Sequence, residues 1–502
     1  MEIPSFNALI QKSIVDHWDM DALTDYKGAT LQYHDVARKI EKLHIMFENS
    51  GVVKGDKIAL CGRNSANWAV AFLATLTYGA IAVPILHEFM PDQIHNIVNH
   101  SDAKLLFVGD VVATQIDATK MPGLEGIIYI PDYSLVVSRT DKLTYAREHL
   151  NEMFGIKYPK YFRKNHVNYY MEQNPDELAM INYTSGTTGD SKGVMLTYSQ
   201  YSAALKANNE CIPVTDKDRV IDFLPFTHIF ERGWAYLCLS EGAELIINTY
   251  PHEIQESMRE MHPTCMCSVP RFWEKVYIAV KAKMDDAGSV QKKLFYHALA
   301  VGKKRNIEYI ANCMRPPLAL ELEYRIINKT VLSMVRKQLG LEKPNIFPTA
   351  GAYVSPEVEE FVHAIGINMV VGYGLTESLA TVSCDHSDKK RSLGSVGRPI
   401  SCIQVKIGED NEVLLKGPTI TPGYYHRDTT NAKAFDKDGF FHTGDAGYLK
   451  DGELFLTERI KDLFKTSNGK YIAPQQVESL LLVDKFIDQV AVIADQRKFV
   501  SA

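Results

Sequence analysis

The chain has 502 residues, which is too long for one ordinary hydrophobic core and favours about three structural units. Hydrophobic residues make up 46% and charged residues 23% of the sequence, a composition typical of globular proteins. The net charge of -6 argues against a nucleic-acid partner, because such proteins carry a basic stripe.

The N-terminal half alternates apolar patterns of two kinds. Val36, Ile40, Leu43 and Phe47 recur at helical spacing. Short apolar runs at residues 58–61, 105–108 and 126–130 are typical of buried strands. Strands that alternate with helices predict α/β layers with parallel sheets.

Residues 67–86 carry no charge and are long enough to span a bilayer. Gly79 and Pro84 interrupt this stretch. We therefore interpret it as a buried helix over 68–78 followed by a buried strand over 80–84. Peripheral contact with a membrane stays open.

The most informative segment is residues 183–193, Tyr-Thr-Ser-Gly-Thr-Thr-Gly-Asp-Ser-Lys-Gly, between apolar runs at 178–181 and 194–196. Glycines let backbone N–H groups approach a ligand, and hydroxyls with a lysine suit phosphate oxygens. The spacing excludes the nucleotide P-loop, which needs four residues between its first glycine and its Gly-Lys pair. The candidate phosphate-binding residues are Thr184, Ser185, Gly186, Thr187, Thr188, Gly189 and Lys192.

Five further segments contain candidate site residues. Residues 223–232 read Phe-Leu-Pro-Phe-Thr-His-Ile-Phe-Glu-Arg, and residues 349–356 read Thr-Ala-Gly-Ala-Tyr-Val-Ser-Pro. Residues 372–378 read Gly-Tyr-Gly-Leu-Thr-Glu-Ser, residues 442–448 read His-Thr-Gly-Asp-Ala-Gly-Tyr, and residues 457–461 read Thr-Glu-Arg-Ile-Lys. Residues 275–337 are charged and amphipathic, which predicts helices, and short strands such as 412–416 alternate with Gly/Pro turns after residue 403.

The order of these motifs resembles the adenylate-forming, or AMP-binding, superfamily, and residues 227–232 most resemble its long-chain fatty acyl-CoA synthetase branch. The resemblance runs from about residue 20 to the end, and Ser191 replaces the proline that is usual in the loop. It implies an α/β fold: a large N-terminal domain (1–460) of layered α/β sheets with a β-rich subdomain (about 395–460), then a small α+β C-terminal domain from 461, incomplete here. Lys461 would be the hinge between the domains.

The resemblance also implies the chemistry. A carboxylate attacks the α-phosphate of ATP to give acyl-adenylate and pyrophosphate, and coenzyme A then displaces AMP. The expected catalytic residues are Lys192, His228 and Glu377, and Thr184 and Glu377 would hold Mg²⁺. The expected nucleotide-binding residues are the loop residues together with Gly351, Ala352, Gly372, Tyr373, Gly374, Thr376, Asp445 and Arg459.

Only 41 residues follow Lys461, and they offer no counterpart of the family's C-terminal catalytic lysine. We therefore expect a truncated form that binds ATP and adenylates poorly. The expected substrate is a medium-to-long fatty acid. The alternatives are an aryl or short-chain ligase, a luciferase-like oxygenase, a peptide-synthetase adenylation domain, or a relative that binds nucleotide and lipid without catalysis.

The eight cysteines are scattered along the chain. The sequence contains no Cys-x-x-Cys pair and no spaced histidine pair, so we do not expect a zinc site. We expect buried, reduced thiols in a cytoplasmic protein. The first residues, Met-Glu-Ile-Pro, lack the basic start and apolar core of a signal peptide. The expected partners are the small-molecule substrates, and a homodimer stays open.

Overall fold

The structure is a computed structural model. It describes residues 5–184, 191–386, 389–460, 464–465, 471–484, 486–487, 489–494 and 499–502. Among these residues, no helix is both long and apolar enough to cross a bilayer.

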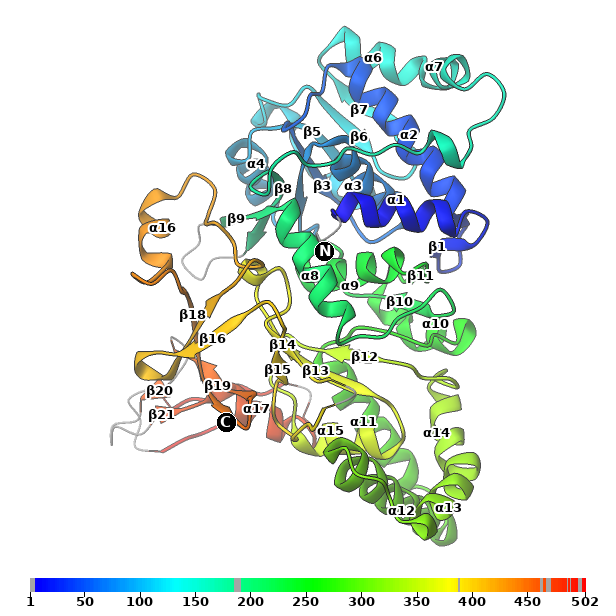
Figure 1. The fold of residues 1–502 in the computed structure, drawn as a ribbon, viewed down its shortest axis with the longest axis vertical. Helices are drawn as coiled ribbons and strands as arrows, with labels where there is room; N and C mark the ends of the chain where they lie inside the picture. Colours follow the sequence, from blue (N-terminus) through cyan, green and yellow to red (C-terminus); the bar gives the residue numbers. More distant parts are fainter. Residues whose placement is uncertain are drawn as a thin grey trace.

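A seven-stranded sheet forms the N-terminal layer, in the order β7-β6-β5-β3-β4-β8-β9 (upper part of Figure 1). Its strands are β3 Lys57–Cys61, β4 Ile81–Ile85, β5 Ala103–Val108, β6 Gly126–Tyr129, β7 Leu135–Ser138, β8 Leu178–Thr184 and β9 Lys192–Thr197. The five central strands are parallel, and β7 and β9 are antiparallel edge strands. The expected parallel α/β layer is confirmed.

Helices cover this sheet on both faces. They are α1 Phe6–Asp16, α2 Tyr33–Ser50, α3 Ala66–Tyr78, α4 Pro91–His100, α5 Asp110–Ala113, α6 Asp141–Glu148, α7 Leu150–Lys157 and α8 Tyr198–Asn209. The uncharged stretch forms the buried helix α3, followed by strand β4, as predicted. Ser65 caps α3, and Gly79 ends it in a left-handed conformation with φ of 89°.

A second layer joins two four-stranded sheets. The first has the order β10-β11-β1-β2 (β1 Asp21–Asp25, β2 Thr30–Gln32, β10 Arg219–Asp222, β11 Glu244–Ile247), and the second has the order β12-β13-β14-β15 (β12 Phe347–Thr349, β13 Met369–Tyr373, β14 Ser383–Cys384, β15 Arg398–Pro399). Isolated bridges from Cys265 to Val220 and Ile346 connect them.

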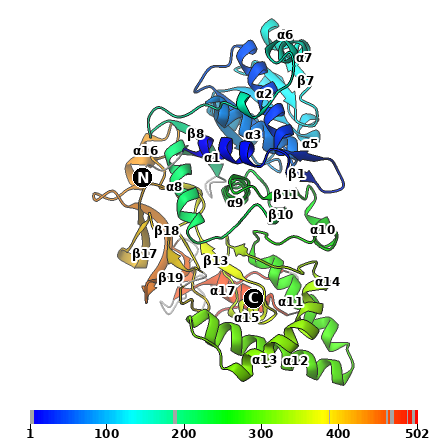
Figure 2. The same ribbon diagram turned by 45° about the vertical axis from the view of Figure 1, so that its right-hand side comes forward.

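The helices of the second layer are α9 Ile229–Ser240, α10 Ile254–Met261, α11 Pro270–Asp285, α12 Ser289–Lys303, α13 Leu318–Ile327, α14 Ser333–Gln338 and α15 Pro356–Ala364. In Figure 2, α9 and α10 lie above β13, beside β10 and β11, whereas α11, α12, α13 and α15 lie below it. The predicted helical region over 275–337 is therefore confirmed. A hydrophobic cluster that includes Trp273, Phe295 and Phe361 packs helices α10 to α15 against the strands of the second layer.

The β-rich region is an antiparallel sheet in the order β16-β17-β18-β19 (Figure 1). Its strands are β16 Gln404–Ile407, β17 Glu412–Lys416, β18 Phe441–Lys450 and β19 Glu453–Arg459, and helix α16 Asp428–Ala434 precedes β18. The last elements are β20 Phe464–Lys465, β21 Tyr471–Ile472 and α17 Pro474–Leu481. The expected fold class, layered α/β sheets with a β-rich region, is confirmed.

Candidate active site

Strands β8 and β9 form the hairpin that holds the hydroxyl-rich loop. Thr184 and Lys192 are partners in the antiparallel ladder, so both ends of the loop are held by sheet hydrogen bonds. The expected phosphate-binding residues Ser185, Gly186, Thr187, Thr188 and Gly189 lie outside the described residues, as does the expected hinge Lys461. Their roles stay predictions.

Tyr424 connects the loop lysine with Glu377, and it was not among the predicted site residues. Its hydroxyl donates to Glu377 Oε1 at 2.8 Å, and Lys192 Nζ lies 5.3 Å from the centre of its ring. The backbone N–H of Thr421 donates to the Glu377 carbonyl at 2.7 Å. The sequence signalled only a Gly/Pro turn here. The role of Tyr424 arises from a strand-like pairing of Tyr424 with Val194 in β9.

The carboxyl ends of β12 and β13 present the next predicted residues at one edge, because these strands are parallel and in register. Gly351 and Ala352 form an exposed bend after β12, and Gly351 adopts a φ of 93°, which favours glycine. A Cβ on Gly374 would lie 1.3 Å from the carbonyl oxygen of Ala380. Glycine is therefore required at position 374, where the chain turns toward Glu377.

Asp445 is held by two of the predicted residues. The Tyr373 hydroxyl donates to Asp445 Oδ2 at 2.6 Å, and Arg459 Nε lies 3.4 Å from Oδ1. Asp445 and Arg459 are partners in the β18–β19 ladder. Burial, together with the Asp445 charge, raises the pKa of Tyr373 well above its ordinary value, so the phenol remains a donor. Tyr373 therefore contacts Asp445 directly and helps to position it. Stacking of the Tyr373 ring on adenine stays a prediction.

Two side chains of α9 hold the segment before His228 through hydrogen bonds to its backbone. Arg232, fully buried, donates to the carbonyl oxygens of Phe226 at 2.6 Å and Thr227 at 3.0 Å. Glu231 accepts from the N–H of Phe223 at 2.9 Å. The Glu-Arg pair of this motif therefore shapes the turn that places His228 at the start of α9.

His228 is exposed at the surface and begins α9 as its N-cap residue. Desolvation by the surrounding chain lowers the pKa of the imidazole, and the charge of Arg232 lowers it further, while Glu88 opposes both. A neutral ring at neutral pH is the result. Among the described residues, the imidazole makes no hydrogen bond, so the structure does not join it to the Tyr424 or Tyr373 groups.

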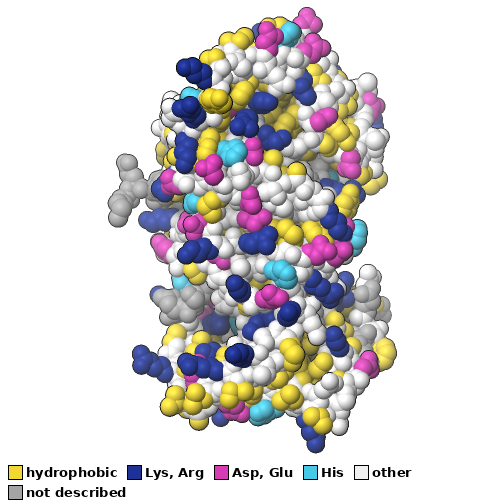
Figure 3. All heavy atoms as spheres, turned by 90° about the vertical axis from the view of Figure 1, so that its right-hand side faces the viewer, with side chains coloured by type: hydrophobic (Ala, Val, Ile, Leu, Met, Phe, Trp, Pro, Cys, Tyr) yellow, Lys and Arg dark blue, Asp and Glu magenta, His cyan; other side chains and the backbone are white. Residues whose placement is uncertain are grey.

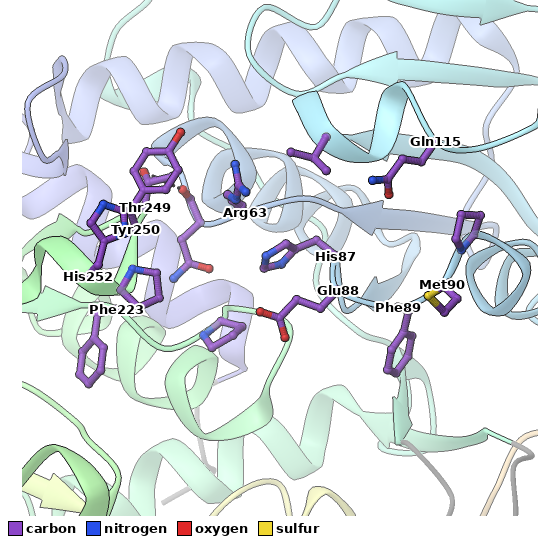
Figure 4. Close-up of a pocket in the computed structure, with 15 residues that line it drawn as sticks. Arg63, His87, Glu88, Phe89, Met90, Gln115, Phe223, Thr249, Tyr250 and His252 are labelled. Atoms are coloured by element: carbon purple, nitrogen blue, oxygen red, sulfur yellow. Dashed lines mark hydrogen bonds between the residues drawn. The ribbon is translucent and has the colours of Figure 1, made fainter. Parts of the chain in front are cut away.

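A cavity of about 980 Å³ lies against this segment (Figure 4). Arg63, His87 and Glu88 point into its centre, and Phe89 and Met90 form an apolar end (Figure 4). Phe223 and Pro225, from the segment before His228, belong to its wall. A cavity of this size with mixed lining is typical of a small-molecule site.

Four of the predicted groups therefore converge. Lys192 and Glu377 meet through Tyr424, Tyr373 and Asp445 are hydrogen bonded, and β13 with the short helix Thr376–Ser378 connects the two pairs. Thr376 and Glu377 are half-buried in that helix. The arrangement puts the cation of Lys192, the carboxylate of Glu377 and the buried acceptor Asp445 along one edge.

Comparisons with known proteins identify the family of this chain. Residues 10–425 match the AMP-binding enzyme family. The chain is 28% identical over 471 residues to long chain acyl-CoA synthetase 3 of Arabidopsis thaliana, covering 89% of this chain and 69% of that protein. It is 27% identical over 515 residues to long-chain-fatty-acid--CoA ligase 1 of Schizosaccharomyces pombe, covering 97% and 73%.

Solved structures support the fold. The anthranilate CoA ligase AuaEII superposes with a TM-score of 0.73 at 17% identity, covering 98% of this chain and 84% of that one. A fatty acyl CoA synthetase of Mycobacterium tuberculosis superposes with a TM-score of 0.67 at 22% identity, covering 97% and 85%. Since the family match over residues 10–425 spans most of the chain, this protein belongs to the AMP-binding enzyme family.

Proposed function

We propose that the chain activates a fatty acid, of medium to long chain, to acyl-adenylate and then to acyl-CoA, with release of pyrophosphate and AMP. The observation that carries the proposal is the linked set Lys192, Tyr424, Glu377, Tyr373 and Asp445. Lys192 offers a cation for the phosphates at one end of the set, and Asp445 offers a buried carboxylate for the ribose hydroxyls at the other end. The similarity to long-chain acyl-CoA synthetases favours fatty acids as the acyl substrate.

In the first half-reaction, the substrate carboxylate attacks the α-phosphorus, and the bond to pyrophosphate breaks. The departing oxygen gains negative charge, so a nearby cation lowers the barrier. Lys192 is at the mouth of the loop and would hold the leaving pyrophosphate. Asp445 would accept hydrogen bonds from the ribose, the role that acidic residues have in dinucleotide folds. The protein therefore contributes chiefly positioning and charge neutralisation.

The residues present fit a Mg²⁺ ion. Glu377 is half-buried, and Tyr424 occupies its Oε1, which orients the carboxylate. Carboxylate and hydroxyl oxygens are the donors that Mg²⁺ prefers, and we propose Glu377 and Thr184 as its protein ligands. When bound, the ion would neutralise charge on the triphosphate.

We assign the cavity beside His228 to coenzyme A in the second half-reaction. Arg63 and the imidazole of His87 lie within it and can contact phosphate groups, and the apolar end at Phe89 and Met90 can contact the rest of the ligand (Figure 4). Arg63→Ala should raise the KM for coenzyme A about tenfold, the value of one charged hydrogen bond of about 1.5 kcal/mol, and leave the KM for ATP unchanged. Equal effects on both KM values would contradict the assignment.

We further propose that residues 1–460 form the AMP-binding domain and that Lys461 begins a mobile C-terminal domain. Peripheral membrane contact is best supported at α13, where Leu318, Leu322 and Ile326 are 76%, 53% and 66% exposed along one face. Figure 1 places α13 at the lower end of the molecule, and Figure 3 shows hydrophobic and basic side chains at that end. Arg325 is also exposed on this helix. Co-sedimentation with anionic vesicles, compared between the native chain and Leu322→Asp, tests this contact.

The experiment that tests the proposed function is pyrophosphate release with ATP and Mg²⁺ and a panel of carboxylates from acetate to palmitate, with benzoate and anthranilate included. Turnover with an optimum among medium or long fatty acids supports the proposal. An optimum among aryl or short-chain acids would replace the substrate class. ATP binding without pyrophosphate release for any acid would favour a non-catalytic role.

A further inference from the structure

Two cysteines and a histidine from distant parts of the chain lie close together at the end of strand β14. Cys211 follows helix α8, Cys384 ends strand β14, and His386 lies two residues beyond. Their ligand atoms all lie within 4.8 Å of one another, and Cys211 Sγ is 3.0 Å from His386 Nε2. Among the described residues, this is the one group of three or more such side chains close enough to share a metal ion.

We propose that Cys211, Cys384 and His386 bind a divalent ion of the zinc class. Tetrahedral zinc with Zn–S of about 2.3 Å and Zn–N of about 2.0 Å places its sulfurs about 3.8 Å apart and sulfur and nitrogen about 3.5 Å apart. The observed atoms are already inside 4.8 Å, so side-chain shifts of about 1 Å are enough to form the site. Two sulfur donors and one imidazole are a soft donor set, which disfavours Mg²⁺ and Ca²⁺.

Charge balance makes the position suitable. Cys211 and Cys384 are each 3% exposed, whereas His386 is half-buried and leaves a route from solvent. Binding converts M²⁺ and two thiols into a neutral M(S⁻)₂(imidazole) unit with release of two protons, so no net charge is buried. Three protein donors leave the fourth position to water on the His386 side.

The ion would connect two elements of the active site. Helix α8 begins directly after β9, which carries Lys192, and Cys211 lies at the other end of this helix. Cys384 pairs with Gly372 in β13, next to Tyr373. A metal at this place would therefore tie the hairpin side of the site to the strand that positions Asp445.

Cobalt binding tests the proposal on the whole chain. The protein is reduced with a phosphine, stripped with a chelator and titrated with Co²⁺, whose thiolate charge-transfer and tetrahedral visible bands report the ligands. We expect one equivalent of cobalt, its displacement by Zn²⁺, and a rise of Tm with Zn²⁺. Loss of one ligand in Cys384→Ser or His386→Gln should weaken binding at least about 100-fold, because even outer partners of a metal site contribute 10–100-fold.

Cys61→Ser is the matched control, since Cys61 is another buried thiol and lies outside the cluster. It should bind cobalt like the native chain. His386→Gln keeps the test usable if Cys384→Ser fails to fold, because His386 is partly exposed. The proposal is overturned if the reduced protein shows no thiolate–cobalt band. It is also overturned if Cys384→Ser and His386→Gln bind cobalt as tightly as the native chain. A Cys211–Cys384 disulfide in the purified protein, with no cobalt uptake after reduction, would overturn it in favour of a redox pair.

Discussion

Removal of the Tyr424 hydroxyl should weaken the response of the protein to Mg²⁺. In Tyr424→Phe the ring over Lys192 remains, and only the 2.8 Å hydrogen bond to Glu377 Oε1 is lost. A hydrogen bond to a charged group contributes about 1.5–3 kcal/mol. The partner that orients a metal-binding carboxylate typically changes metal affinity by about 10–100-fold. We therefore expect the half-saturating Mg²⁺ concentration to rise by about 10–100-fold.

The assay is carboxylate-dependent pyrophosphate release at saturating ATP, titrated with free Mg²⁺. At saturating Mg²⁺ the rate of Tyr424→Phe should approach that of the native chain, because the ring and Lys192 are intact. Tyr425→Phe is the matched control. Its hydroxyl donates to Asp102 at an exposed position, 3.1 Å away, and its removal should leave the Mg²⁺ response unchanged.

The pair Tyr424 and Glu377 also allows a double-mutant test. If Tyr424 acts through Glu377, the Phe substitution has no further effect in a Glu377→Gln background. A half-saturating Mg²⁺ concentration within twofold of the native value, or full additivity of the two substitutions, would refute the reasoning.

Three other changes test the site and its support. Tyr373→Phe removes a donor to Asp445 and should raise the Kd for ATP about tenfold, checked by titration calorimetry with ATP; an unchanged affinity would contradict this role. Gly374→Ala places a Cβ 1.3 Å from the Ala380 carbonyl and should lower stability by at least about 2 kcal/mol, seen as a lower Tm; an unchanged Tm would contradict the close approach. Burial and the nearby Asp385 raise the pKa of Glu359 from 4.5 to about 8, so the folded state holds this proton more tightly than the unfolded chain. Stability should therefore fall as pH rises from about 4 to 8, and Glu359→Gln should raise Tm at pH 8 and above but change it little at pH 4, a difference worth up to about 4 kcal/mol.

The sequence by itself determined the fold class and most of the candidate site. Strand-length apolar runs such as the one over 105–108 and the helical spacing from Val36 to Phe47 are local patterns, and the structure places β5 and α2 there. Motif residues such as Glu377 and Asp445 were selected because their segments resemble motifs of the AMP-binding family, and their roles stay predictions.

Tertiary structure alone decided which side chains meet. The Tyr424–Glu377 contact depends on a bridge between residues 194 and 424, and nothing local marks it. The meeting of Cys211 with Cys384 and His386 depends on the tertiary fold, which brings the segment after α8 to the end of β14, so cysteine spacing predicted no metal site. Periodic patterns in the sequence indicate the backbone conformation and the burial of a short segment, because residues close in sequence determine both. Contacts between residues 47 to 230 positions apart are determined by packing of whole layers, which one sequence does not display.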